Sequence, residues 1–414
     1  MSTLQFRRRR VFWAQLLYTA GPGLVVMLAD TDAGSIITIA QSGAKWGYHF
    51  LLPNLLFVPF MFMAQELALR LGLGTGQGAA ELVLRRIGRG SATVLLITLV
   101  ASCFGALVSE MSGLAGAGLA FGLPAWLTMG GTVAGLILMV MTGSYRSVER
   151  IALFLGLFEL AFFIMAWKAK PDFAQVFHEI KRLPLYDNDY LYLLAANLGT
   201  SVIPWALFYQ QSASVDKGLG RAQLKAARIE TFAGVILCQS ITSALLIAAG
   251  ATLRSGGDSV PLETVEQIGT AFTATLGGAT GRAIFVLGLT GGALVATIVV
   301  CLTLAWAVGE VLGVRHSLEH QPRQAPWFYG ALTLMLISGG LLVASSLNLV
   351  ALSVAAGVAN ALLLPVVLGF LYWLARTALP ESLRLQGAYG IAAAIAFTVT
   401  AGVGLYSGLA GTLW

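Results

Sequence analysis

Charged residues are scarce in this chain of 414 residues. Asp, Glu, Lys and Arg make up only 11% of it, against about 25% in a soluble domain. Hydrophobic residues make up 57%, and the mean hydropathy is +0.81. So little charge cannot cover a water-exposed surface, which excludes soluble enzymes and nucleic-acid-binding proteins. The net charge of +6 therefore needs an explanation other than an anionic partner.

Cysteine is also scarce. Cys103, Cys238 and Cys301 each lie inside an apolar run, and their spacing matches no metal-binding motif. Three widely spaced cysteines do not make a disulfide scaffold. We therefore expect each cysteine to be a small, buried hydrophobic side chain that binds no metal.

Long apolar runs are what the sequence has in quantity, and runs of about 18 to 25 residues predict membrane-spanning helices. We expect eleven of them in a single membrane domain covering residues 1–414, near 11–40, 49–70, 91–120, 124–143, 151–168, 189–213, 229–251, 284–312, 327–345, 348–375 and 388–412.

The basic residues indicate the orientation of these helices. If the N-terminus is cytoplasmic, 18 of the 25 Lys and Arg residues fall on the cytoplasmic side, as positive-inside topology requires. No small-residue cleavage site follows the basic segment 7–10, so we read the first run as a membrane helix and not as a signal peptide. A bacterial inner membrane fits the short loops.

Two of the expected helices contain polar and helix-breaking residues at mid-membrane. The first does so within 21–35 and the sixth within 197–211. Paired interruptions five helices apart are typical of transporters built from inverted repeats, with the binding site at the midplane. The predicted fold is therefore an all-α, LeuT-type inverted repeat of helices 1–5 and 6–10, followed by an eleventh helix.

The first interruption carries two carboxylates, Asp30 and Asp32. One charge at the bilayer centre costs about 2.5 to 3.5 kcal/mol on insertion scales, and no Lys or Arg of the same helix lies nearby, so the pair needs a cation. Carboxylate and carbonyl oxygens favour hard ions such as Mg²⁺, Ca²⁺ or Mn²⁺. Alternatively, one aspartate caps a half-helix, and small residues such as Gly199 serve helix packing.

These segments resemble the natural resistance-associated macrophage protein (Nramp) family of divalent-metal transporters, and the resemblance extends over most of the chain. It is carried by Gly21-Pro22-Gly23, Asp32-Ala33-Gly34-Ser35, the segment 65–76, Phe121-Gly122-Leu123-Pro124, Glu149-Arg150 and Ile203-Pro204-Trp205.

Several residues depart from the family pattern. Ser35 replaces an asparagine and Ala33 a proline, whereas Ile203 replaces the methionine whose thioether favours soft metals. Trp205 and Gln210 stand where the sixth helix of the family has histidines. The acidic positions of the third helix become Ala106 and Ser109, with Glu110 one residue out of register. All four histidines fall in loops or at helix ends: His49, His178, His316 and His320.

The departures resemble the Nramp-related magnesium transporter branch, which implies uptake of partly hydrated Mg²⁺, and also Mn²⁺, by alternating access without proton coupling. The resemblance implies that the metal is the substrate, with no cofactor and no obligate protein partner besides the lipid bilayer. The predicted metal-binding residues are Asp32, Asp30, Ser35, Thr200 and Gly199. The predicted cavity-lining or supporting residues are Ala33, Ile203, Trp205, Gln210 and Asn360.

Other functions remain open at this point. A proton-coupled Mn²⁺ or Fe²⁺ transporter would need Glu110 or Asp30 to replace the missing histidines. An organic-solute transporter on the same fold is disfavoured, because two aspartates would repel a substrate carboxylate, and little favours a non-transporting receptor. Among the other acidic residues, we expect Glu66, Glu230 and Glu310 to contact water or nearby arginines. Glu110 and Glu159 are candidates for a permeation path or an ion pair.

Overall fold

The computed structural model describes residues 21–142, 144–254, 262, 265–345 and 349–413. These residues are almost entirely helical, and no strand occurs among them. The basic segment 7–10 and residues 11–20 of the first expected span lie outside the described part. Nine runs in this part are long and apolar enough to cross a membrane.

The expected spans map onto these helices in chain order. The first is split into α2 (Pro22–Asp30) and α3 (Ala33–Trp46), and the turn η1 (Gly47–Phe50) leads directly into α4 (Leu51–Thr75). The third to fifth correspond to α6 (Arg89–Leu119), to α7 (Ala125–Val140), which is shorter than predicted, and to the sequence α8 (Tyr145–Gly156), η2 (Leu157–Leu160) and α9 (Ala161–Lys168).

The second half repeats this arrangement. Its first span is split into α11 (Asn188–Ser201) and α12 (Pro204–Asp216), and the others are α13 (Leu224–Thr252), α15 (Gly278–Leu312), α16 (Pro326–Ala344) and α17 (Leu349–Thr377). The eleventh span is α18 (Gly387–Leu413). Three short helices lie outside the expected spans: α5 (Ala79–Arg86), α10 (Phe173–Glu179) and α14 (Val265–Leu276). Two short turns do so as well: η3 (Arg221–Gln223) and η4 (Glu381–Leu383).

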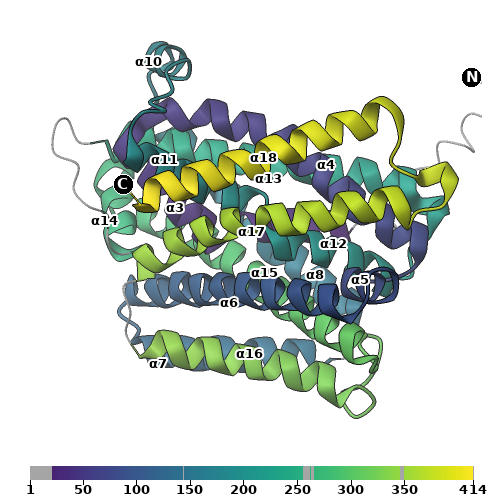
Figure 1. Cartoon of the computed structure of the whole chain (residues 1–414). Helices are drawn as coiled ribbons and strands as arrows, with labels where there is room; N and C mark the ends of the chain where they lie inside the picture. Colours follow the sequence, from purple (N-terminus) through teal and green to yellow (C-terminus); the bar gives the residue numbers. More distant parts are fainter. Residues whose placement is uncertain (1–20, 143, 255–261, 263–264, 346–348, 414) are drawn as a thin grey trace, which may run out of the picture.

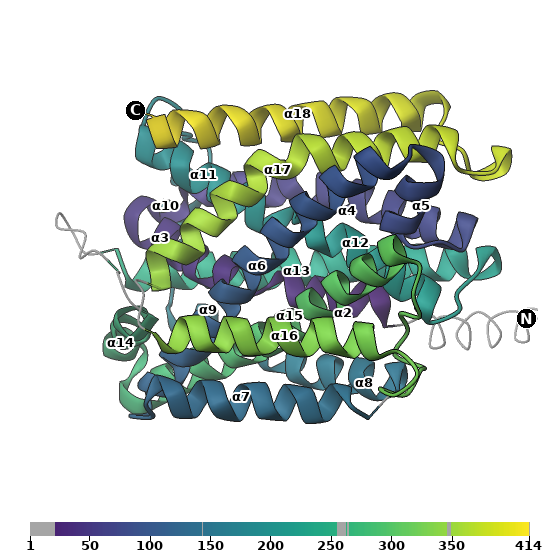
Figure 2. The same ribbon diagram turned by 60° about the horizontal axis from the view of Figure 1, so that its bottom comes forward.

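The helices form a bundle in which the split helices are the innermost. Figures 1 and 2 show α18 and α17 on one side and α7 and α16 as a neighbouring pair on the other, with α2, α3, α11 and α12 between them. The apolar stretch of the split helix Asn188–Asp216 is 94% buried, against 33% for α18. Asp30, Thr31 and Asp32 at the first break are also buried. The two breaks therefore lie in the interior, away from lipid.

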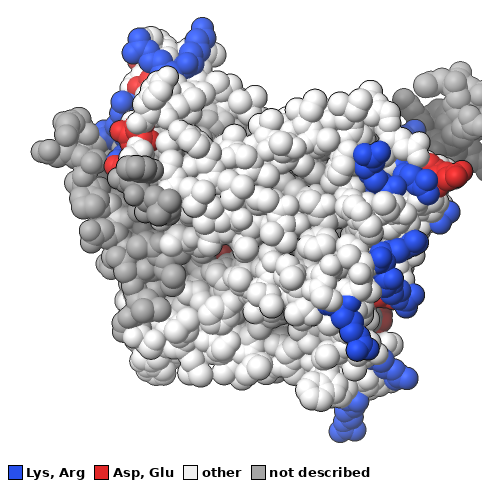
Figure 3. Space-filling view, viewed as in Figure 1, with Lys and Arg blue, Asp and Glu red and all other residues white. Residues whose placement is uncertain are grey.

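The surface charges agree with a molecule that spans a membrane. Figure 3 shows Lys and Arg gathered at the end that carries α5 and around α10 at the opposite end, with a broad band between them that is white apart from one small acidic spot. Together with the nine apolar runs, this distribution describes an integral multi-pass membrane protein.

The buried acidic residues near the α5 end hold helices together. Glu66 binds Arg70 (2.7 Å) and Arg228 (2.6 Å), as expected, and accepts a hydrogen bond from Tyr389 (3.1 Å). For Glu230 and Glu310 the expectation was contact with water or an arginine; the described contacts include no arginine ion pair, and both residues accept hydrogen bonds from backbone N–H groups instead. Glu230 caps the N-terminus of α2, and Glu310 caps α5.

Glu66→Gln should lower the stability of the protein by about 3 kcal/mol, the low end of the range for breaking a buried ion pair, because it leaves the buried Arg70 beside a neutral group, whereas Arg228 is 37% exposed and is still solvated. Glu81→Gln is a matched control, since the Glu81–Arg85 pair is a surface pair in which Arg85 is 65% exposed, and such pairs contribute about 0 to 1 kcal/mol. Thermal unfolding in detergent measures both variants. Equal shifts would show that Glu66 contributes no more than a surface ion pair.

Candidate functional site

The first break lies between Asp30, the last residue of α2, and Ala33, the first residue of α3. Asp32 has an extended backbone conformation (φ −78°, ψ 174°), and its Oδ1 accepts a hydrogen bond from Ser35 N at 2.6 Å. Glu110 reaches in from α6, where its Oε2 accepts a hydrogen bond from Ala33 N at 2.9 Å. Two carboxylates therefore share the N-terminal end of α3, where each accepts a backbone N–H group.

The second break separates α11 from α12. Ile203 is extended (φ −92°, ψ 131°) because Pro204 follows it and disfavours the helical conformation. Pro204 then occupies the first turn of α12, where its missing N–H costs nothing. The last turn of α11 consequently leaves backbone carbonyls available at the same depth as Asp32.

Ser35 joins the two breaks. Its Oγ lies 2.9 Å from Asp30 O and 3.2 Å from Thr200 O. A hydroxyl has a single proton to share between these two carbonyl oxygens, so one of the two carbonyl oxygens keeps its lone pairs available to a cation. Because Ser35 N also donates to Asp32 Oδ1, Ser35 brings together Asp32 and Thr200 of the predicted metal-binding residues, and we call Asp32, Ser35 and Thr200 the crossing site.

Asp30 lies next to the crossing site, but its carboxylate is turned toward α13. Cys238 Sγ lies 3.7 Å from Asp30 Oδ2, and Thr31 Oγ1 donates to the same sulfur at 3.5 Å. Cys238 is a buried free cysteine, as predicted, and its thiol also belongs to a buried polar chain that the sequence did not indicate. Of the two aspartates, Asp32 is the one that caps a half-helix.

Gly199 is placed differently from the other predicted ligands. A Cβ at this position would lie 1.9 Å from Gly357 O and 2.7 Å from Ala361 N, because the backbones of α11 and α17 touch here. The bare face of Gly199 therefore serves close helix packing, which is the alternative considered for the small residues.

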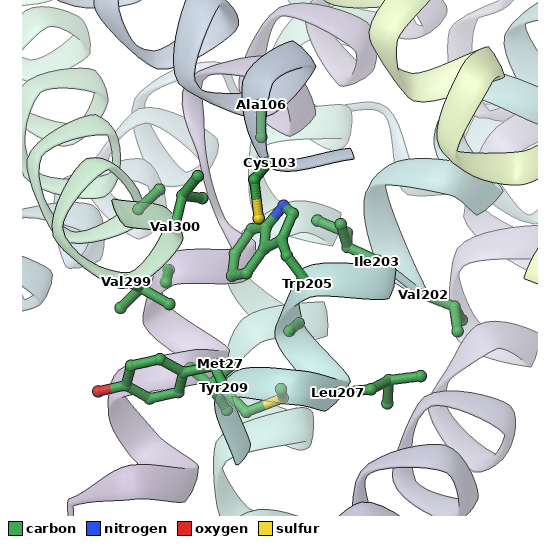
Figure 4. Packing of buried hydrophobic residues seen from close by; sticks show 14 of the residues in the cluster. Met27, Cys103, Ala106, Val202, Ile203, Trp205, Leu207, Tyr209, Val299 and Val300 are labelled. Atoms are coloured by element: carbon green, nitrogen blue, oxygen red, sulfur yellow. The ribbon is translucent and has the colours of Figure 1, made fainter. Parts of the chain in front are cut away.

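The predicted lining residues take several positions. Figure 4 shows Trp205 beside Cys103 and Ala106, with Ile203 and Val300 around it; Trp205 is fully buried. It is thus an aromatic side chain packed between helices. Ala33 contributes its N–H to Glu110 and packs its side chain where Gly113 of α6 lacks one.

Gln210 and Asn360 connect helices away from the crossing site. Gln210 Nε2 donates to Thr231 Oγ1 at 3.1 Å, which ties α12 to α13. Asn360 Oδ1 accepts from Ser102 Oγ at 2.7 Å, which ties α17 to α6. Both contacts fit the role of polar links between membrane helices.

Direct protein ligands are few. Among the described residues, no group of three or more His, Cys, Asp and Glu is placed to hold a metal ion. The crossing site instead offers one or two carboxylates together with hydroxyl and carbonyl oxygens. Such a donor set suits a hard ion that retains water ligands.

The α5 end of the molecule is closed beneath the site. Glu230 accepts hydrogen bonds from Gly21 N (2.6 Å) and Leu24 N (2.9 Å), which fixes the start of α2 to α13. Lys217, after α12, binds Glu149 of α8 at 2.8 Å. Asp30 and Asp32 are only 2% and 4% exposed, so an ion reaches them only after these contacts or those at the other end rearrange.

The chain matches the family model "Natural resistance-associated macrophage protein-like" over residues 23–410. It is 28% identical over 276 residues to the divalent metal cation transporter MntH of Bradyrhizobium diazoefficiens, covering 63% of this chain and 60% of that relative. It is 25% identical to the protein of the same name from Acidiphilium cryptum, covering 93% and 88%. The manganese transporter of Eremococcus coleocola has the same fold, with a TM-score of 0.76 at 18% identity over 96% of this chain and 87% of that one.

These relatives are named as transporters of metal ions, which agrees with the expectation of a transporter rather than an enzyme and of a metal as substrate. They establish the fold of inverted repeats and the family. The magnesium branch is not distinguished by them.

Proposed function

The chain belongs to the Nramp family, and from that premise we propose that it moves divalent metal cations across a membrane, with Mg²⁺ as the principal substrate and Mn²⁺ as a second. The observation that carries the proposal is the crossing site, where Asp32, Ser35 and the Thr200 carbonyl offer oxygen alone. Mg²⁺ is commonly bound through one or two carboxylates while it keeps several waters.

Ile203 supports the preference for a hard ion. It lies directly before α12 at the second break and is buried. The resembled family has a methionine at this position. An aliphatic side chain offers no sulfur, so it gives soft transition metals no advantage over Mg²⁺.

Transport would follow from alternate opening of the two ends. Opening at the α5 end would require α2 to leave Glu230, and Lys217 to part from Glu149. We propose that this end is cytoplasmic and that the membrane is a bacterial inner membrane. A doubly charged ion gains about 4.6 kcal/mol from a potential of 100 mV, at about 2.3 kcal/mol per charge, so uptake needs no coupled proton.

The second candidate function is proton-coupled transport of Mn²⁺ or Fe²⁺. Two observations favour it: the relatives are named for divalent metals or manganese, and Glu110 brings a second ionisable carboxylate to the break.

Ion flux in liposomes separates the two candidates. We expect a negative interior potential to drive Mg²⁺ into proteoliposomes containing a Mg²⁺ dye and a pH dye, without acidification. Mn²⁺ entry with acidification and no Mg²⁺ signal would instead establish the second candidate.

Ile203→Met should raise the transport of Mn²⁺ and Cd²⁺ relative to Mg²⁺ by about tenfold, which corresponds to about 1.4 kcal/mol of added discrimination from one thioether ligand. Ile203→Leu changes the shape of the side chain without adding sulfur and serves as the control. Competition between Cd²⁺ and Mg²⁺ for flux measures the ratio. An unchanged ratio in the methionine variant would mean that residue 203 does not face the ion.

A further inference from the structure

Glu159 is a buried carboxylate that the crossing site does not use. It lies in η2, between α8 and α9, and is completely buried. Within the described part of the chain, neither Oε1 nor Oε2 has a hydrogen-bond partner, and the same is true of Asp30 Oδ1. An unpaired buried charge is destabilising by several kcal/mol, so each of these carboxyl groups holds either a proton or a cation.

The neighbours of Glu159 belong to the first break. A Cβ placed on Gly292 of α15 would lie 2.2 Å from Thr31 O and 3.7 Å from Glu159 Oε1, so both oxygens border the bare face of this glycine. Thr31 donates its proton to Cys238 Sγ, and the thiol lies against Asp30 Oδ2. The thiol proton of this polar chain is thus directed toward Asp30, and Thr31 lies between Cys238 and Glu159.

The charges on the two sides of the break are unequal. Asp32 and Glu110 receive N–H groups from the N-terminus of α3. Asp30 instead ends α2, where the helix dipole is negative, and the Glu159 carboxylate borders the next residue, Thr31, across the bare face of Gly292. None of the ion pairs among the described residues includes any of these four carboxylates.

We propose a second cation-binding position, formed by Glu159, Asp30 and Thr31 on the side of the first break that faces η2, α13 and α15. It takes a divalent cation of the same hard class as the crossing site, because two carboxylates match a charge of two. This inference rests on the proposed function. The transport pathway then contains two ion-binding positions, and an ion bound at one of them weakens the binding of an ion at the other by electrostatic repulsion. Weak binding at several positions is what allows an ion to leave as well as enter.

Equilibrium binding to the purified full chain tests the proposal, with Mn²⁺ as an EPR-visible probe and Mg²⁺ as its competitor. The wild-type chain should bind two ions, Glu159→Gln one, and Asp32→Asn one. Glu159→Asp keeps the charge and should retain two, with weaker binding of the second. Glu310→Gln is the matched control for a buried carboxylate and should still bind two, since Glu310 is fully hydrogen-bonded at the start of α5.

The outcomes separate this inference from the proposed function. If the wild-type chain binds one ion, or if a folded Glu159→Gln still binds two, the second position does not exist. If Na⁺ at equal concentration displaces the second Mn²⁺, the position belongs to a monovalent ion and the divalent assignment is overturned. If the folded wild-type chain binds no divalent ion at all, the proposed function fails together with the second position.

Discussion

Replacing Asp32 by asparagine should abolish divalent-cation flux while leaving the fold intact. Asparagine caps a helix about as well as aspartate, so its side-chain oxygen can still accept the hydrogen bond from Ser35 N. The substitution removes only the charge that holds the ion beside Ser35 and the Thr200 carbonyl. We expect a loss of at least about 100-fold in flux, equivalent to about 2.8 kcal/mol of ion binding.

Asp187→Asn provides the matched control. Asp187 caps α11 in the same way, with Oδ1 accepting from Asp189 N (2.9 Å) and Tyr190 N (3.1 Å), but it is exposed in the loop before that helix. Both variants should unfold at the wild-type temperature, and only Asp32→Asn should lose Mg²⁺ uptake into proteoliposomes. Full uptake by a folded Asp32→Asn would remove Asp32 from the ion pathway, and an equal loss in both variants would attribute the effect to capping.

The two breaks could be predicted from the sequence because their signals are local. Pro204 interrupts the sixth span by backbone chemistry alone, and the cost of intramembrane charge marks Asp30 and Asp32, where the first span breaks, wherever the other helices pass. The fold followed from the positions of these breaks five helices apart. The expectation that Ser35 and Thr200 lie close together followed from the crossing of the two broken segments, and their oxygens are in contact.

The other contacts depend on which face each helix presents to its neighbours, which local patterns do not reveal. Cys238 looked like any apolar cysteine, yet α13 turns its thiol toward Asp30. Glu159 and Glu110 were recognised only as deep carboxylates, and their place at the break became visible once α6, η2 and α15 were positioned around it. From the sequence, a single intramembrane polar residue such as Asn360 could be either a metal ligand or a hydrogen-bonded link between helices. In the structure Asn360 is hydrogen-bonded to Ser102 of α6.

Gly199 shows the same ambiguity and allows a decisive test. Gly199→Ala should destabilise the protein by about 3 kcal/mol, the upper part of the usual range for overpacking, because the added methyl group would meet backbone atoms of α17 and not a flexible side chain. The clash would also displace Thr200, which follows directly in α11. We therefore expect both a lower unfolding temperature in detergent and a loss of Mg²⁺ flux.

Gly369→Ala is the control. Gly369 lies in α17, the helix against which Gly199 packs, and nothing lies within 4 Å of a Cβ added at Gly369. There the substitution should stabilise the helix by about 0.5 to 1 kcal/mol and leave transport unchanged. If Gly199→Ala unfolds at the wild-type temperature but binds Mg²⁺ more weakly, Gly199 acts in the ion site itself and the packing role is wrong. Loss of stability and flux together, with Gly369→Ala intact, would mean that the α11–α17 contact holds the Thr200 carbonyl at the depth where the ion binds.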